Sequence, residues 1–257
     1  MILLTIIIGI YGLIIGSFLN VLIYRIPRDE NIAWPGSHCT SCGHNLRWYD
    51  NIPLFSYMFL RGRCRYCGDK ISIQYPVVEA TNAIIYVLLF LSFYSGSKLD
   101  FVFYAMISSV LVTIAFIDLK EQIIPDSLVL TVLGISIIQK ALAHYLDGIT
   151  FPLMNSILGL LIAGGIFLLI VFFSGGGMGG GDVTLIGALG FILGVRLIFL
   201  NIFLSFILGA VISIFLLATR IKARKDPIPF GPFIILGFFI TLFMGNELLS
   251  WYFNILI

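Results

Sequence analysis

The chain has 257 residues, of which 60% are hydrophobic and only 11% are Asp, Glu, Lys or Arg. Soluble domains carry about 25% charged residues, so this composition excludes a water-soluble globule. It also excludes disordered, collagen-like and coiled-coil chains. The net charge of +2 argues neither for nor against nucleic acid, and we expect no nucleic-acid partner. We expect an all-α protein that crosses the membrane several times.

Apolar stretches of spanning length recur along the chain. A spanning helix needs about 17–25 mostly apolar residues. The sequence predicts eight transmembrane helices, at approximately 2–24, 77–96, 101–117, 127–145, 152–173, 183–195, 197–219 and 230–255. The sixth is the least clear, because it is short and contains Gly187, Gly190 and Gly194. Residues 2–24 lack the basic segment that opens a signal peptide, so we expect a retained first helix.

The basic residues divide unequally between the two sets of loops that alternate along the chain. Twelve of the 15 fall in one set, whereas the other set holds Lys98, Lys140 and Arg196. Cytoplasmic loops carry the excess of Lys and Arg. The cytoplasmic loops are therefore expected to be 25–76, 118–126, 174–182 and 220–229. Both termini then face outward, and an odd number of spans would largely remove the bias.

All four cysteines lie in the first cytoplasmic loop, as Cys39-x-x-Cys42 and Cys64-x-x-Cys67. Two such pairs about 20 residues apart are typical of a tetrahedral zinc site. The alternative is a pair of disulfides or four free thiols, and a reducing cytoplasm disfavours disulfides. Four thiolates leave no position open for a substrate, so we expect a structural zinc that organises the loop. His38 and His44 flank the first pair, and we expect them to be ordinary loop residues.

Four carboxylates lie at the ends of predicted helices: Glu79, Asp118, Asp126 and Asp182. An ionisable residue at the edge of a spanning segment is costly, which makes it a functional candidate. Asp126 and Asp182 each precede a helix and suit an N-cap, and we favour that role for Asp126. Capping does not explain the run 175–181, which is glycine except at one position and lets another backbone approach closely.

Asp118 and Asp182 share the cytoplasmic edge of the membrane in this topology. Two neighbouring aspartates can share a proton, so that one acts as general base toward water and the other as general acid. This arrangement favours aspartic proteolysis, although an ion-coupled transporter also uses carboxylates in the membrane. The glycine run matches a dinucleotide fingerprint only formally, because no βαβ unit surrounds it.

Six motifs in order make the sequence resemble the type IV prepilin peptidases, the bifunctional leader peptidases and N-methyltransferases of pilus and secretion systems. They are GSFLNVLIYR at 16–25, DNIPLFSY at 50–57 with RGRC at 61–64, YPVVE at 75–79, ID at 117–118 with IPD at 124–126, GMGGGD at 177–182 and IPFGPF at 228–233. The resemblance covers nearly the whole chain. The sequence departs from the family's pattern at Thr184, where lysine is usual. This difference does not affect the expected fold, but it bears on the preference for substrate or pH.

This resemblance implies a chemistry and a set of partners. It assigns Asp118 and Asp182 as the catalytic pair of a GxGD-type intramembrane aspartic protease. The implied substrates are type IV prepilins or pseudopilins in the lipid bilayer, each with a short basic leader that is cut after glycine at the cytoplasmic face of the inner membrane. The new N-terminus is then methylated, with S-adenosylmethionine as the donor.

The methyl-transfer site is expected among the motifs of the first third of the chain. Its candidate residues are Asn20, Arg25, Asp50, Gly62 and Glu79. A carboxylate can hold the sulfonium or the substrate amine, and the alternative for Glu79 is a residue at the helix start that the dipole favours. We therefore divide the chain into a first transmembrane helix (1–24), a methyltransferase-associated zinc loop (25–76) and a membrane aspartic peptidase domain (77–257).

An ion-coupled membrane transporter is the alternative function. It predicts a carboxylate near the middle of the membrane and inverted repeats between the two halves of the chain, and the sequence shows neither. A structural protein of a secretion apparatus would not need the paired aspartates, the glycine run and the cysteine loop together.

Overall fold

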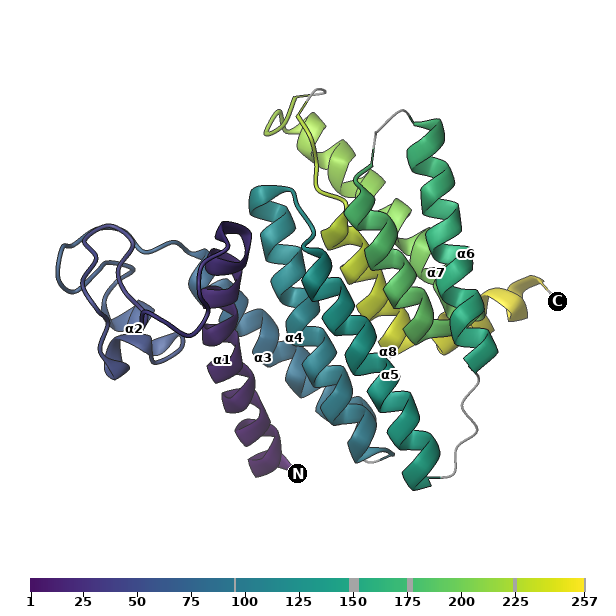
Figure 1. The fold of residues 1–257 in the computed structure, drawn as a ribbon, viewed down its shortest axis with the longest axis horizontal. Coiled ribbons are helices and arrows are strands. Elements are labelled where there is room, and N and C mark those ends of the chain that lie inside the picture. The colour runs from purple at the N-terminus through teal and green to yellow at the C-terminus, as the bar shows by residue number, and fades with distance from the viewer. Residues whose placement is uncertain (95, 148–152, 175–177, 224–225, 257) are drawn as a thin grey trace. The chain divides into compact units, whose positions relative to one another are not determined.

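The computed structural model is all-helical, and it describes residues 1–94, 96–147, 153–174, 178–223 and 226–256. Its elements in chain order are α1 (Ile2–Arg25), η1 (Ile26–Arg28), η2 (Trp48–Asn51), α2 (Phe55–Phe59), α3 (Gln74–Phe93), α4 (Lys98–Glu121), α5 (Asp126–Asp147), α6 (Leu153–Phe173), α7 (Gly180–Ala218) and α8 (Gly231–Leu256) (Figure 1). In the described part of the chain, seven helices are long and apolar enough to cross a membrane. The predicted all-α membrane fold with a cysteine-bearing loop is confirmed.

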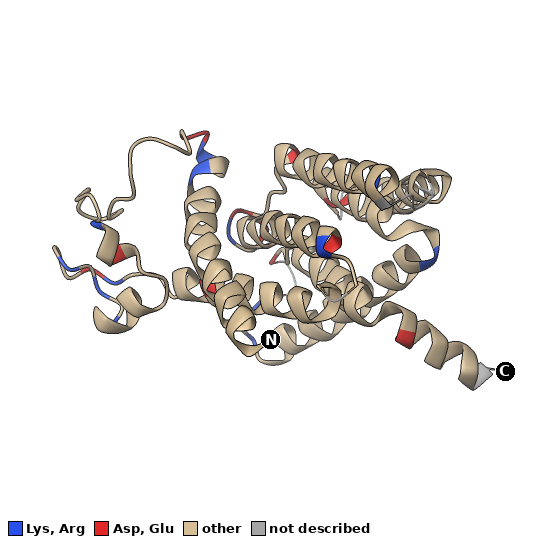
Figure 2. Ribbon diagram, turned by 90° about the horizontal axis from the view of Figure 1, so that it is seen from below, with Lys and Arg blue, Asp and Glu red and all other residues tan. Residues whose placement is uncertain are grey.

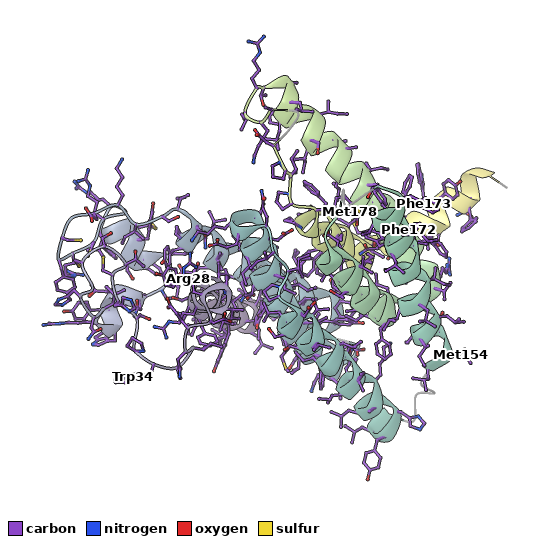
Figure 3. The ribbon with its side chains drawn as sticks, turned by 45° about the horizontal axis from the view of Figure 1, so that its top comes forward. Arg28, Trp34, Met154, Phe172, Phe173 and Met178 are labelled. Atoms are coloured by element: carbon purple, nitrogen blue, oxygen red, sulfur yellow. The ribbon has the colours of Figure 1, made fainter. Side chains whose placement is uncertain are left out.

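Some predicted features lie outside the described residues. They are the first part of the glycine run, 175–177, and two basic residues of the last cytoplasmic loop, Arg224 and Lys225. Elsewhere the long helices are almost free of charged residues, which gather near the helix ends and in the loop after α1 (Figure 2). Apolar side chains cover the helix surfaces, as at Phe172 and Phe173, which are 78% and 80% exposed (Figure 3). Such surfaces suit a lipid environment.

The chain forms two compact units, Met1–Phe116 and Ile117–Ile257. In the first unit, α1 and α3 pack through glycines of α1. A Cβ atom added at Gly12 would lie 2.6 Å from Cα of Ala83, and one added at Gly16 would lie 2.7 Å from Cα of Glu79. Glycine therefore permits a backbone approach that any larger residue would prevent, as is common between membrane helices.

Asn82, Ser109 and Tyr86 form a hydrogen-bonded network in the first unit. The Asn82 side chain donates a 2.8 Å hydrogen bond to the carbonyl of Gly12. The Ser109 hydroxyl donates to Oδ1 of Asn82 at 3.1 Å and lies 3.0 Å from the Tyr86 hydroxyl. Hydrogen bonds between helices hold polar groups that lipid cannot satisfy, so this network fixes the register of α1, α3 and α4.

In the second unit, α7 is a single element of 39 residues that contains the sixth and seventh predicted helices. At Gly194 the backbone leaves the helical conformation, with φ 71° and ψ 176°, values that glycine adopts readily. Before this break α7 packs antiparallel to α6, with Gly190 against Gly159 and Gly187 against Gly164. The sixth and seventh predicted helices are therefore the two helical segments of α7, which meet at the break at Gly194.

After the break, α7 packs against α8. Gly237 of α8 lies against Ser205, and Gly245 lies against Leu197. Later residues of α8 therefore meet earlier residues of α7, which makes these segments antiparallel. Since α7 and α8 both begin beside Ile124, the chain must reverse its direction within α7. The eight predicted segments are all present, although two of them belong to one interrupted element.

Candidate active site and metal centre

Asp118 lies in the last turn of α4, where it is only 4% exposed. Its Oδ2 accepts a 3.0 Å hydrogen bond from the backbone N–H of Gly231, the first residue of α8. A Cβ atom added at Gly231 would lie 2.6 Å from the same oxygen. The absence of a side chain at this position therefore allows the start of α8 to approach the carboxylate and donate to it.

Asp182 lies in the first turn of α7 and is 7% exposed. Its Oδ2 accepts a 3.2 Å hydrogen bond from the backbone N–H of Gly179, which precedes the helix. Its Oδ1 is buried and has no hydrogen-bond partner among the described residues. Asp182 therefore stabilises the start of α7 with one oxygen and keeps the other available.

The segment between α4 and α5 brings the two aspartates together. Cβ of Ile124 lies 2.7 Å from the position a Cβ would take at Gly181, and its Cδ1 lies 3.1 Å from the corresponding position at Gly231. Ile124 is thus in contact with the residue before Asp182 and with the residue that binds Asp118. The two carboxyl groups are close enough to interact electrostatically.

Asp126 occupies the first position of α5 and is exposed. The N–H of Leu128 donates to the carbonyl of Pro125 at 3.0 Å, so Pro125 occupies the N-cap. The predicted capping role of Asp126 is therefore wrong by one residue, although a carboxylate in the first turn still suits the helix dipole. The Thr184 hydroxyl lies 3.4 Å from Oδ1 of Asp126, which links the starts of α5 and α7.

The sulfurs of Cys39, Cys42, Cys64 and Cys67 all lie within 4.8 Å of one another. Cys39 Sγ and Cys67 Sγ are 3.9 Å apart. Four sulfurs bound to a tetrahedral zinc at about 2.3 Å would be separated by about 3.8 Å. All four cysteines are free of disulfides, so the donor set fits a tetrahedral metal ion.

Two equivalent turns build this cluster. The N–H of Gly43 donates to the carbonyl of Cys39 at 2.8 Å, and the N–H of Gly68 donates to the carbonyl of Cys64 at 2.9 Å. Both glycines have a positive φ, of 69° and 78°, which favours glycine. An isolated antiparallel bridge closes each turn. The glycine after each cysteine pair is therefore a requirement of the turn.

The four thiols interact, and the pKa values of two of them shift in opposite directions. Desolvation alone would raise the pKa of the Cys39 thiol, but hydrogen bonds from the backbone of Cys42 and Ser41 lower its pKa to about 7. At Cys67 a backbone hydrogen bond lowers the pKa, but desolvation and hydrogen bonds with the other three thiols outweigh it and raise this pKa. The thiolate is the form that binds metals. His44 stacks on Tyr66, with ring centroids 3.6 Å apart, and is not part of the cluster of metal-binding side chains.

Asp50 connects the two halves of the cysteine loop. Its Oδ1 accepts a 2.8 Å hydrogen bond from Nε of Arg65, and its Oδ2 accepts bonds from the hydroxyl of Tyr66 and the N–H of Arg47. Partial desolvation raises the pKa of the Asp50 carboxyl, but the hydrogen bonds from Arg65 and Arg47 outweigh it and hold this pKa below its ordinary value. Asp50 therefore stabilises the loop as an ionised carboxylate.

Two other predicted methyl-transfer residues also make internal contacts. Arg25 is 4% exposed, and its guanidinium donates to four backbone carbonyls between residues 31 and 36. Gly62 has φ 67°, and a Cβ added to it would lie 2.9 Å from the Tyr57 hydroxyl. Both residues shape the loop, so the five candidates do not converge on a single pocket for a cofactor.

Asn20 and Glu79 differ from the other candidates because they lie where α1 meets α3. Oε2 of Glu79 accepts a 2.8 Å hydrogen bond from the N–H of Leu54, and Ser17 bonds to the same carboxylate. The Asn20 side chain donates to the carbonyl of Tyr75 at 3.1 Å. Its Oδ1 is buried and has no partner among the described residues. These two side chains retain acceptor capacity inside the first unit.

Comparisons with known proteins agree with the motifs. Residues 10–93 match the bacterial peptidase A24 N-terminal domain, and residues 105–214 match the type IV leader peptidase family. The chain belongs to the type IV leader peptidase family. Membership makes it a membrane peptidase, and the ion-coupled transporter is not favoured. The seven candidate spans agree with a multi-pass membrane protein.

Members of the type IV leader peptidase family match nearly the whole chain. A protein of Legionella pneumophila is 32% identical over 96% of this chain and 93% of its own length. Proteins of Xanthomonas campestris and Pseudomonas putida are 34% and 30% identical, over 94% and 93% of this chain and 91% and 90% of their own lengths. All three are named prepilin leader peptidase/N-methyltransferase. No solved structure matches the chain significantly.

Sequence reasoning missed the backbone groups that hold the aspartates in this leader peptidase. The N–H groups of Gly179 and Gly231 have no side-chain signature. Both glycines lie in motifs of the family, but a motif does not show which group its backbone contacts. The position of Gly231 between Pro229-Phe230 and Pro232 was an available signal, because proline flanking a helix start often marks its first turn.

Proposed function

We propose that this chain is a prepilin peptidase that removes the short basic leader of type IV prepilin-like proteins and then methylates the new N-terminus. One observation carries the proposal. Asp118, at the end of α4 and beside the start of α8, lies close enough to Asp182, at the start of α7, for the two carboxyl groups to interact. The names of its relatives supply the substrate class and the second activity.

Asp118 and Asp182 are assigned as the catalytic pair. One aspartate takes a proton from a water molecule as the water oxygen bonds to the carbonyl carbon of the leader's last residue, which the family resemblance gives as glycine. The other, initially protonated, donates to the carbonyl oxygen. When the intermediate collapses, the C–N bond breaks and the leaving amine takes up a proton. Oδ1 of Asp182, which has no partner among the described residues, is the oxygen that we assign to the water.

The active site is proposed to face the cytoplasm of the inner membrane. Asp118 and Asp182 lie at the helix ends that adjoin the loops with twelve of the basic residues. By the positive-inside rule we assign these loops to the cytoplasm. A basic leader would then lie in water while the apolar helix after the cleavage site stays in the bilayer. Water reaches such a dyad more easily than one at the middle of the membrane.

We assign zinc to the cysteine cluster. Cys39, Cys42, Cys64 and Cys67 would hold it as four thiolates, because their spacing and mutual distances fit tetrahedral sulfur coordination. With all positions filled by protein, the ion has a structural role. The loop has few buried apolar side chains, so its fold depends on the metal and on the Asp50–Arg65 ion pair.

Methyl transfer is assigned to the first unit, where S-adenosylmethionine would supply the methyl group when bound. Arg25, Asp50 and Gly62 maintain the loop, whereas Asn20 and Glu79 offer acceptors to a bound group. The substrate amine must lose a proton before or during its methylation, and the carboxylate of Glu79 is placed to receive it.

The proposal is tested by incubating the detergent-solubilised protein with a prepilin and S-adenosylmethionine and measuring the mass of the product. Loss of the leader and addition of a methyl group are separate readouts. We expect both with the wild type and neither with Asp182→Asn. An intact prepilin with the folded wild type, together with ion movement in vesicles, would instead support the transporter.

A further inference from the structure

An apolar groove with a volume of about 440 Å³ runs along the pair of helices α1 and α3 in the first unit. It is lined by α1 between Ile6 and Leu13, by α3 between Ala80 and Leu88, and by Leu54 from the cysteine loop. The residues that line it are all apolar. Gly9 is among them, and a Cβ added there would make an ordinary 3.5 Å contact with Val87.

One end of this groove is polar and buried. Leu54 lines the groove, and its N–H donates the 2.8 Å hydrogen bond to Glu79. Glu79 directly precedes Ala80, which also lines the groove. Ser17, which bonds to Glu79, lies about one helical turn after Leu13 on α1. The carboxylate therefore marks the end of the groove nearest the cysteine loop.

The polar groups at this end lack a cationic partner. Glu79 is 7% exposed, and neither of the ion pairs recorded among the described residues includes it. Asn20 is 4% exposed and its Oδ1 is unpartnered in the described part of the chain. Glu79 accepts hydrogen bonds from Leu54 and Ser17, but a buried carboxylate without an opposite charge and a buried carbonyl oxygen without a donor are both costly. The end of the groove is therefore complementary to a cation that donates hydrogen bonds.

We propose that this groove binds the apolar N-terminal helix of the cleaved pilin, with its new α-amine held by Glu79 and Asn20. The inference rests on the proposed function, because cleavage creates the amine. An α-amine has a pKa of about 7.7–8.0, so it reaches the site as a cation. The groove runs about 12 Å along α1 and accepts about two turns of a helix that lies in the bilayer. The same pairing presents the amine for methylation.

The closing experiment measures binding without the methyl donor. The probes are two synthetic peptides of identical apolar sequence, one with a free α-amine and one N-acetylated, added to the full chain in lipid nanodiscs. The wild type should bind the free-amine peptide about tenfold more tightly, as expected for one charge-assisted hydrogen bond. Glu79→Gln should remove this preference, because Gln keeps the shape and loses the charge.

Filling the groove tests its apolar part. Gly9→Leu should weaken the binding of both peptides by about tenfold, as loss of the contacts of one apolar side chain implies. Gly165→Leu is the matched control, because Gly165 of α6 has no atom within 4 Å of an added Cβ, and it should bind as the wild type does. Gly9→Ala adds only an ordinary contact, so it should fold and show a smaller effect.

Two outcomes would overturn the inference. Unchanged binding by Gly9→Leu would mean that the groove holds lipid only, and a persistent amine preference in Glu79→Gln would place the amine elsewhere. Either result leaves the proposed function intact if the wild type still methylates a cleaved pilin. Absence of methylation by the folded wild type would instead contradict the proposed function, whatever the peptides do.

Discussion

The backbone N–H of Gly231 donates a 3.0 Å hydrogen bond to Oδ2 of Asp118, although 113 positions separate the two residues. The contact requires a residue without a side chain, since an added Cβ would lie 2.6 Å from that oxygen. The start of α8 therefore fixes the orientation of the Asp118 carboxylate.

Gly231→Ala should reduce kcat for leader cleavage by about 10–100-fold, because the added methyl group displaces the Asp118 carboxylate, and small displacements of a reacting group have effects of this size. KM for the prepilin should change little. The measurement is steady-state cleavage of a purified prepilin. Gly165→Ala is the control, because its Cβ meets no atom within 4 Å. Wild-type kcat in Gly231→Ala would remove Gly231 from the active site.

Asp118→Asn and Asp182→Asn should each abolish leader cleavage while the protein still inserts and folds. Asn keeps the shape of Asp and its hydrogen bonds from the backbone, but it cannot exchange a proton as Asp does. Product masses after long incubation provide the test. Asp126→Asn is the control and should retain substantial activity, because Asp126 is exposed and its Oδ1 accepts from the Thr184 hydroxyl at 3.4 Å, a bond that Asn can also accept. The opposite pattern, with Asp126→Asn inactive, would reassign the pair.

The sequence was sufficient to predict the spans, the clustering of the four cysteines and the proximity of Asp118 to Asp182. Hydropathy and charge act locally, so they place helices and loops without knowledge of the packing. The break at Gly194 lies next to the boundary expected between the sixth and seventh helices, at 195–197. The contacts of α7 with α6 and α8 agree with the reversal that this boundary requires.

The motifs did not predict that the side chains of Asp50 and Arg25 form hydrogen bonds with other groups of the protein. A motif shows that a residue type is needed, but not whether its side chain meets a substrate or the protein's own backbone. Arg25 contacts four carbonyls within a segment that has no regular structure, and no periodic pattern predicts such contacts. The hydrogen bond between Leu54 and Glu79 could not be predicted either, because it too joins a side chain to the backbone of an irregular segment.

One zinc ion per chain should be found by elemental analysis of the purified protein. Replacing any one of the four cysteines with serine should lower this content and make the loop sensitive to protease, because metal binding and folding of the loop are coupled. Ser41→Ala, between two ligands but outside the set of sulfurs, is the control and should keep the metal. A metal-free wild type with a protease-resistant loop would contradict the assignment.

Asp50→Asn should loosen the cysteine loop at pH 7 without removing the metal ligands. Because the folded-state pKa of Asp50 is lowered, its stabilising effect is present above the ordinary aspartate pKa of about 3.9 and is lost as the pH falls through the folded value. At pH 7 the effect is therefore complete. Limited proteolysis should cut Asp50→Asn faster than wild type, and high salt should reduce the difference, since the Arg65 side chain is 47% exposed. Equal rates at low salt would show that the ion pair contributes nothing.

The two activities should separate in Asp118→Asn when the substrate is varied. With an intact prepilin this variant should give neither cleavage nor methylation, because the α-amine does not exist before cleavage. Supplied with an already cleaved pilin and S-adenosylmethionine, it should methylate at the wild-type rate, since Asn20 and Glu79 lie in the first unit and are unchanged. Glu79→Gln should show the reverse, with near-normal cleavage and a methylation rate reduced by about tenfold or more, as loss of one buried charge-assisted contact implies. Mass measurement of the product distinguishes every case. If folded Asp118→Asn fails to methylate the cleaved pilin, the two sites are coupled and the division of labour proposed for them is wrong.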